Sequence, residues 1–368
     1  MRTRPPIVAV EGLQVVKGRN LILDVPFLEI EQGEIFSLIG PNGAGKTTLL
    51  QALSFLSKPS RGKVCFGGKP IGNGFPVLEY RRKLSMVFQE PLLFNTTVFE
   101  NVASGLKIRG VNRAQIRNVV SRQLERFGVA HLEQRSARTL SGGEAQRTSL
   151  ARAFAVHPEI LFLDEPFASL DPPARESLIQ DLEGVLRETQ TTAVLATHDR
   201  MEALRLSDRI AVMERGKIAQ IGPPAEVMNH PADEFIASFV GTETILTGSA
   251  VGGNAGTFTT SVSGRLIEAA GGALPGEQVI LCIRPENVTL SANPVPEPSS
   301  ARNVFSATVE RIIPAGFFHK VRLDCGFPLV AYVTNHALED LRLEPGKNVF
   351  ASFKATAIHV IRKKPLSS

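Results

Sequence analysis

The segment GPNGAGKTT, residues 40 to 48, matches the pattern G-x-x-x-x-G-K-[ST]. The apolar run EIFSLIG leads into it, and the helix-like TTLLQALSFL continues from its end. Backbone N–H groups in such a turn converge on phosphate oxygens, and the positive end of the following helix adds to the attraction. The segment therefore predicts a phosphate-binding loop between a strand and a helix, formed by Gly40, Pro41, Asn42, Gly43, Ala44, Gly45, Lys46, Thr47 and Thr48.

Two carboxylates extend this chemistry. In ILFLDEP an apolar strand ends in Asp164 and Glu165. Because successive strand side chains point to opposite faces, the two must play different parts. We expect Lys46 to contact the terminal phosphates, Thr47 and Asp164 to ligate Mg²⁺, and Glu165 to polarise an attacking water.

The rest of the chain suggests two domains. Strand-like and helix-like patterns alternate over residues 1–240, which predicts an α/β domain with a mainly parallel sheet. Within it, NRAQIRNVVSRQLERFGV has apolar residues at helical spacing and predicts an amphipathic helix in an inserted helical region. Residues 241–368 are richer in short strands, with ANPVPEPSS as a linker, and predict a β-rich domain.

Composition limits the classes of function. A net charge of +5 over 368 residues is too balanced to favour binding to nucleic acid. Three cysteines far apart in sequence favour a reduced protein with buried thiols over a disulfide framework. No segment approaches the roughly 20 apolar residues needed to span a bilayer, so work at a membrane would require another chain.

LSGGEAQR, Leu140 to Arg147, resembles the signature motif of ATP-binding cassette (ABC) transporter ATPases. Ser141, Gly142 and Gly143 precede a helix-like segment and would form a second anion cradle. In that family the cradle closes over ATP held by the opposite subunit. The resemblance, which covers about residues 5 to 240, therefore implies a homodimer with two shared ATP sites.

Further family motifs occur in the expected order. Gln89 in MVFQEPLLF resembles the glutamine that contacts Mg²⁺ and senses the permease. Asp171 in SLD resembles the loop that crosses the dimer interface, and His198 in LATHD resembles the histidine that bonds the γ-phosphate. One departure is that no aromatic residue stands near Lys17, where the family stacks adenine, so packing must use Val16, the stem of Lys17 or another element.

The β-rich domain contains a repeat. LPGEQVILCIRPENVTL and EPGKNVFASFKATAIHV each place a valine three residues and a basic residue eight residues after a Pro-Gly pair. The basic residues are Arg284 and Lys354. The repeat predicts two small OB-like modules, about residues 243–292 and 300–363.

The second module resembles the mop-type domain that binds molybdate and tungstate, on the segments SARN, VTNHALEDLRLEPG and FKATAIHV. A tetrahedral oxyanion needs several N–H and hydroxyl donors and about one compensating positive charge. The resemblance implies an oxyanion site formed by Ser300, Ala301, Arg302, Thr334, Lys354, Ala355 and Thr356. In the first module RPE stands where the second has KAT, and no ligand is expected there.

Together the resemblances imply the Mg²⁺- and ATP-dependent subunit of a molybdate or tungstate importer, peripheral on the cytoplasmic face of the cell membrane. Its implied partners are a second copy, integral membrane permease subunits and, indirectly, an extracytoplasmic solute-binding protein. The tail would sense cytosolic oxyanion and inhibit the ATPase. Two alternatives stay open: an importer ATPase for iron, sulfate, sugar or polyamine whose tail is structural or regulatory, and a soluble oxyanion-binding regulator.

Overall fold

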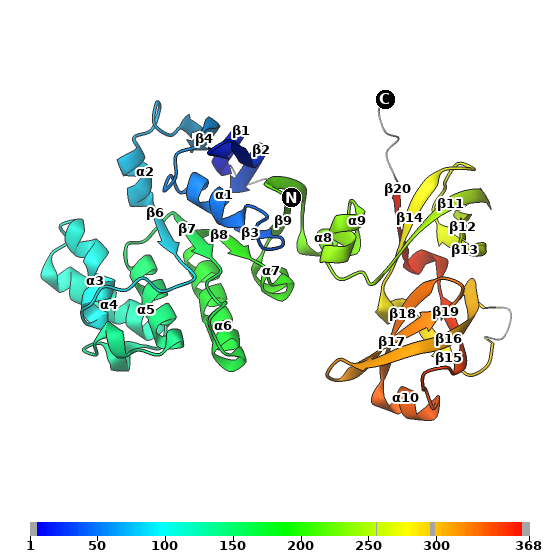
Figure 1. Cartoon of the computed structure of the whole chain (residues 1–368). Coiled ribbons are helices and arrows are strands. Elements are labelled where there is room, and N and C mark those ends of the chain that lie inside the picture. Colours follow the sequence, from blue (N-terminus) through cyan, green and yellow to red (C-terminus); the bar gives the residue numbers. More distant parts are fainter. Residues whose placement is uncertain (1–5, 255, 295–298, 363–368) are drawn as a thin grey trace. The chain divides into compact units, whose positions relative to one another are not determined.

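The computed structural model describes residues 6–254, 256–294 and 299–362, and the chain forms two compact units, Met1–Ala225 and Glu226–Ser368 (Figure 1). Residues 295–298 of the expected linker lie outside the described residues. The predicted ATPase boundary at residue 240 stays a prediction. The first unit ends at Ala225, within α8 (Pro224–Asn229), and α9 (Glu234–Phe239) lies between that point and residue 240.

A six-stranded sheet organises the first unit, in the order β10-β9-β3-β8-β7-β6. Every strand except the antiparallel edge strand β10 runs parallel to its neighbours. All side chains of β3, β7 and β8 are buried, as expected for a sheet covered on both faces. The strands are β3 (Ile35–Ile39), β6 (Leu84–Val87), β7 (Ile160–Asp164), β8 (Thr192–Thr197), β9 (Arg209–Glu214) and β10 (Lys217–Gly222).

An antiparallel sheet, which the sequence pattern did not reveal, has the order β2-β1-β4-β5. Its apolar face and helix α1 share a core with Phe36, Phe162 and Val194 of the parallel sheet. Residues next to these in sequence, such as Leu161 and Leu195, enter a different core, because strand side chains alternate between faces. The strands are β1 (Pro6–Lys17), β2 (Asn20–Glu31), β4 (Arg61–Phe66) and β5 (Lys69–Pro70).

The predicted helical region is confirmed. Helices α3, α4 and α5 pack together at one end of the first unit (Figure 1), and α4 (Arg113–Arg126) is the amphipathic helix expected from the sequence. Ile116, Val120 and Leu124 of α4 are buried in the core that covers the second face of the sheet. The other helices are α1 (Lys46–Leu53), α2 (Val77–Lys83), α3 (Val98–Ile108), α5 (Gly142–Ala155), α6 (Pro172–Thr189) and α7 (Arg200–Leu206).

The second unit contains two five-stranded sheets, in the orders β13-β12-β11-β14-β20 and β15-β19-β16-β17-β18. One apolar core contains residues of both sheets. The three cysteines of the chain are free and buried, as predicted. The elements are β11 (Thr244–Asn254), β12 (Thr257–Val262), β13 (Arg265–Ala270), β14 (Gln278–Ile283), β15 (Thr289–Ser291), β16 (Asn303–Pro314), β17 (Phe318–Asp324), β18 (Pro328–Thr334), α10 (Asn335–Asp340), β19 (Asn348–Phe353) and β20 (Ile358–Arg362).

The two sequence repeats exchange strands. Each repeat forms a strand, a 3₁₀ turn and a second strand: β14 to β15 in the first and β19 to β20 in the second. Strand β14 of the first repeat pairs with β20 of the second, and β19 of the second pairs with β15 of the first. The register is the same in both: Cys282 lies opposite His359, and the equivalent residue Ser352 lies opposite Thr289. The sheets therefore do not coincide with the expected modules 243–292 and 300–363, because each half supplies a strand to the other.

Candidate functional site

The phosphate loop connects β3 to α1, as its sequence predicts. Gly45 occupies the N-cap position of α1 with a φ of 101°, which favours glycine. At Gly40 a Cβ atom would lie 2.4 Å from the Met213 carbonyl oxygen, so no larger residue fits without a shift. The Lys46 ammonium donates to the carbonyls of Gly40, at 2.9 Å, and Pro41, at 3.2 Å. The loop thus holds its cation against its own backbone.

Asp164 lies at the end of β7, directly beside the start of α1. The Thr47 hydroxyl donates to the Asp164 carboxylate over 2.9 Å. Burial raises the pKa of Asp164, although the bond from Thr47 and the charge of Lys46 oppose the shift. Burial likewise lowers the pKa of Lys46, against the attraction of Glu165 and Asp164. A hydroxyl and a carboxylate in contact are oxygen donors of the kind that Mg²⁺ prefers, so these residues fit the ion.

Glu165 has a strained backbone. Its φ is 46°, which is unusual for a residue with a side chain, and its N–H donates to the Ala196 carbonyl of β8 over 2.8 Å. The Glu165 carboxylate lies 3.1 Å from Nδ1 of His198, which follows β8. Strain of this kind persists where the surroundings enforce it and is concentrated at functional sites. The structure therefore brings together the phosphate loop, Asp164, Glu165 and His198.

Ser141, Gln89 and Asp171 lie at the ends of other elements, and all three are exposed. Ser141 is the N-cap of α5 and forms a reciprocal capping box with Glu144, while Gly142 and Gly143 begin the helix. Asp171 is the N-cap of α6. Gln89 follows β6, and its carbonyl accepts a bond from the Ser169 hydroxyl over 3.4 Å. Their expected roles toward nucleotide stay predictions.

The β1–β2 hairpin lies near the phosphate loop. Leu23 of β2 comes within 3.5 Å of the position that a Cβ on Gly45 would take, and Val15 pairs with Leu23. One step further along the hairpin, Val16 pairs with Leu21, and their side chains are 42% and 51% exposed. An exposed apolar pair is thus available to pack on adenine. Val16 is one of the residues expected from the sequence to pack on adenine, whereas Leu21 is evident only from the cross-strand register.

The segments expected to form the oxyanion site come together with one exception. Asn303 at the start of β16 pairs with Phe353 at the end of β19, so the segment 300–302 lies beside the segment 354–356. Thr334 instead lies at the other end of the sheet, because it pairs with Phe318 near the far end of β16. Its hydroxyl accepts from the Ala337 N–H and caps α10. Ser300, Arg302, Lys354 and Thr356 are exposed, Ala301 is half-buried and Ala355 is buried.

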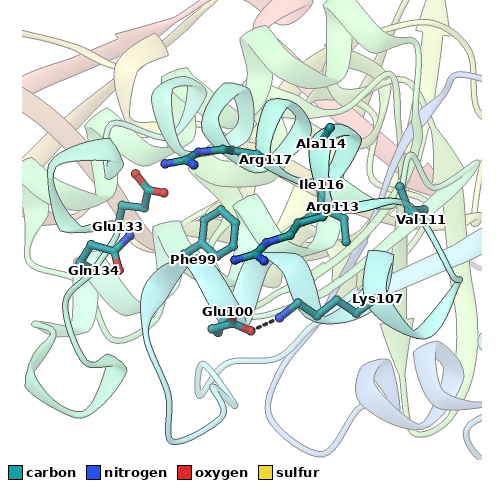
Figure 2. A pocket seen from close by; sticks show the side chains of 10 residues that line it. All are labelled: Phe99, Glu100, Lys107, Val111, Arg113, Ala114, Ile116, Arg117, Glu133 and Gln134. Carbon is teal, nitrogen blue, oxygen red and sulfur yellow. Dashed lines mark hydrogen bonds and ion pairs between the residues drawn. The ribbon is translucent and has the colours of Figure 1, made fainter.

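Two hollows of the first unit lie outside these motifs. One, of about 500 Å³, is rimmed by Leu78, Phe94 and Ile108, which are 64%, 57% and 84% exposed. The other, of about 770 Å³, lies between α3 and α4; Figure 2 shows Phe99 among Arg113, Arg117 and Glu133, and the ion pair of Glu100 with Lys107. Neither contains a residue of the phosphate loop.

Within the described ranges, no helix is both long and apolar enough to cross a membrane.

Comparison with known proteins identifies the family. The family model "ABC transporter" matches residues 23–168, and "TOBE domain" matches residues 299–360. A molybdate/tungstate import ATP-binding protein of Pyrococcus horikoshii is 40% identical over 337 residues, which cover 90% of this chain and 93% of that protein. The chain belongs to the ATP-binding proteins of ABC transporters.

Two further similarities differ in extent. A spermidine/putrescine import ATP-binding protein of Thermobifida fusca is 46% identical over 224 residues, covering 61% of this chain and 58% of that protein. The solved structure of cbiO1 from Clostridium perfringens, described as part of the ABC transporter complex cbiONQ, is 30% identical with a TM-score of 0.57 and covers 65% of this chain and 95% of that one.

Membership of the ABC transporter family means that this chain binds ATP and hydrolyses it to energise transport. The predicted family and the fold, an α/β P-loop ATPase followed by a β-rich OB-like TOBE domain, are confirmed.

Proposed function

We propose that this chain is the ATPase subunit of an importer for molybdate or tungstate. The observation that carries the proposal is the identity kept over nearly the whole chain, tail included. The Pyrococcus horikoshii molybdate/tungstate protein is 40% identical over 90% of this chain, whereas a sulfate/thiosulfate importer protein is 36% identical over 88%. The segments 300–302 and 354–356, which meet at the β16–β19 pair, support it, because they add two exposed cations and two hydroxyls at one place.

The ATPase of a polyamine importer is the second candidate. The Thermobifida fusca spermidine/putrescine protein has the higher identity, 46%, but over only 61% of this chain, and a spermidine/putrescine protein that covers 89% of this chain is 36% identical. Spermidine is a polycation, whereas the proposed tail site presents Arg302 and Lys354, and like charges repel. This charge argument favours an anionic solute over a polyamine.

Calorimetric titration of the full chain tests the substrate. We expect molybdate and tungstate to bind, spermidine not to bind, and sulfate to bind less tightly. Tight binding of spermidine, or of sulfate alone, would replace the proposal with an importer for that solute.

For hydrolysis we propose that Glu165 polarises the attacking water and that His198, bonded to it, contacts the γ-phosphate. Lys46 would move from the loop carbonyls to phosphate oxygens, which backbone N–H groups of the loop would also bind. Mg²⁺, held by Thr47, Asp164 and Gln89, would neutralise phosphate charge. The cradle at Ser141 is exposed, so we propose that it serves ATP bound to a second copy in a homodimer.

The membrane partner would bind at the hollow rimmed by Leu78, Phe94 and Ile108. Three large apolar side chains at least 57% exposed around one hollow are unusual for a surface that always faces water. The hollow also contains Ser85 and Met86 of β6, the strand that leads to Gln89. We propose that a segment of the permease fills it, so that the chain lies on the cytoplasmic face of the membrane, while a separate extracytoplasmic binding protein delivers solute to the permease.

We further propose that the tail senses the imported oxyanion. Binding at the segments 300–302 and 354–356 would hold the homodimer in an arrangement that does not hydrolyse ATP, which is inhibition by product. Millimolar molybdate or tungstate should then slow the ATPase of the assembled transporter. An unchanged rate with both oxyanions would contradict the sensor and leave the ATPase assignment intact.

A further inference from the structure

A network of charged and hydroxyl side chains connects the loop of His198 to helix α6. The Arg175 guanidinium, in the first turn of α6, bonds the Asp199 carboxylate. It also bonds the Glu202 carboxylate through two nitrogens, at 2.6 and 3.0 Å. Bonds from a fork-shaped guanidinium to two carboxylates fix orientation as well as distance. We call Arg175, Thr197, Asp199 and Glu202 the Arg175 network.

The Arg175 network holds both neighbours of His198. On one side, the Thr197 hydroxyl donates to Glu202 and accepts from the Asp199 N–H at 3.0 Å. On the other side, Asp199 caps α7 by accepting from the N–H groups of Met201, at 2.7 Å, and Glu202, at 3.3 Å. The backbone on either side of His198 is therefore fixed, while the ring itself is exposed and bonded to Glu165.

Charge makes Arg175 the critical member of the network. Glu202 is only 4% exposed, and burial raises its pKa, although bonds from Thr197 and Arg175 oppose the shift. Burial also acts to raise the pKa of Asp199, but the bonds from Arg175 and two backbone amides outweigh it and lower that pKa. Without Arg175, two neighbouring carboxylates would face each other with no cation between them, and the loop would have to move.

The position of Arg175 in the chain also connects the Arg175 network to the SLD segment. Arg175 lies four residues after Asp171, whose carbonyl accepts its N–H at 2.9 Å. Asp171 ends the SLD segment and caps α6. A displacement of that segment would therefore reach the His198 loop through one side chain.

We propose that Arg175 is a positioning residue for hydrolysis, which ties the start of α6 to the His198 loop and keeps the His198 ring against Glu165. The inference rests on the roles proposed above for His198 and Glu165. Its effect is on the rate of the chemical step, because none of its bonds reaches the phosphate loop.

Steady-state ATPase measurements on the full chain test this. Arg175→Ala should lower kcat by roughly 10- to 100-fold, since a misplaced catalytic group costs about that much, and leave the KM for ATP within about twofold. His198→Ala should lower kcat at least as far. The double variant should be no slower than His198→Ala alone, because Arg175 acts through that residue. Arg175→Lys should recover only part of the rate, since an ammonium cannot replace the fork.

Arg205→Ala is the matched control. Arg205 also joins α7 to α6, through ion pairs with Glu176 and Glu183, but these carboxylates are more exposed than Asp199 and Glu202 and neither lies in the His198 loop. Its kcat should equal that of the unmodified chain. If Arg175→Ala does not fold, as judged by its melting curve, Asp199→Asn takes its place, because the amide oxygen still caps α7 while the ion pair is lost.

Three results would overturn the inference: an unchanged kcat in Arg175→Ala and Asp199→Asn, a rise in KM without a fall in kcat, or a loss that multiplies with that of His198→Ala. Normal hydrolysis by His198→Ala would instead contradict the proposed role of His198, and the role of Arg175 would fall with it.

Discussion

The ATP site of the first unit and the proposed oxyanion site of the second are built on different kinds of sheet. Asp164 ends β7, while Lys46 and His198 follow β3 and β8, and these three neighbouring strands run parallel and end at one edge of the sheet. The oxyanion segments flank a single antiparallel pair, β16 and β19, and their polar side chains are exposed. A parallel sheet collects residues far apart in sequence, so its chemistry is fixed by the fold. An antiparallel pair fixes only the positions of the residues that flank its two strands.

The sharpest test of the first site is Glu165→Gln. The variant keeps the size of the side chain but removes the base, so we expect ATP binding to persist and turnover to fall by about 100-fold or more. Binding of a labelled nucleotide and steady-state phosphate release measure the two properties. Glu159→Gln, which breaks an exposed ion pair with Lys83 just before the same strand, is the control. Hydrolysis near the normal rate in Glu165→Gln would refute its role as the base.

The second site is tested by removing its charges. Arg302→Ala and Lys354→Ala should each weaken molybdate binding by roughly 10- to 100-fold, the worth of a hydrogen bond to a charged group. Basal ATP hydrolysis without oxyanion should stay unchanged in both. Arg311→Ala changes an exposed arginine within β16, the strand that follows Arg302, and should bind normally. Equal affinity in all three variants would remove the oxyanion from this pair of segments.

A smaller effect is expected at the β1–β2 hairpin. Lys17→Tyr should lower the KM for ATP by about two- to tenfold, because a ring stacked on adenine adds roughly 0.5–1.5 kcal/mol. Leu21→Ser should raise the KM, since it removes half of the exposed pair formed with Val16. Leu274→Ser, the same change at an exposed leucine of the second unit, controls for general surface effects. A KM insensitive to both hairpin variants would place adenine elsewhere.

The smallest expected change in molybdate affinity is that of a variant at Thr334, which lies apart from the other expected ligands. Thr334→Ala should leave molybdate affinity within about twofold and cost about 1 kcal/mol of stability through loss of the α10 cap. Thr356→Ala, the same change beside Lys354, should weaken binding instead. If Thr334→Ala were the weaker binder, the oxyanion would lie at the α10 end of the sheet. Calorimetry and thermal unfolding together distinguish these outcomes.

The same contrast explains what the sequence could predict. The positions of Lys46, Asp164 and His198 can be predicted from the short apolar strands that precede them. Side chains at the carboxyl ends of parallel strands meet at one edge of the sheet. Thr334 was grouped with Lys354 by motif, but its place depends on the register of β16, β17 and β18, which no local pattern encodes. Leu21 and the Arg175 network were missed for the same reason, since each depends on contacts between separate elements.

The exchange of strands between the two repeats has a consequence for how the tail folds. Strand β20 completes the sheet that begins at β11, and its pairing joins Val279 to Arg362, 83 residues apart. During synthesis the first repeat therefore leaves the ribosome before β20 has been made. One edge of β14 stays unpaired until the second repeat follows. Such long-range closure is slow and exposes strand edges to misassembly. Shortening the chain from β20 onward would thus damage the sheet that forms first.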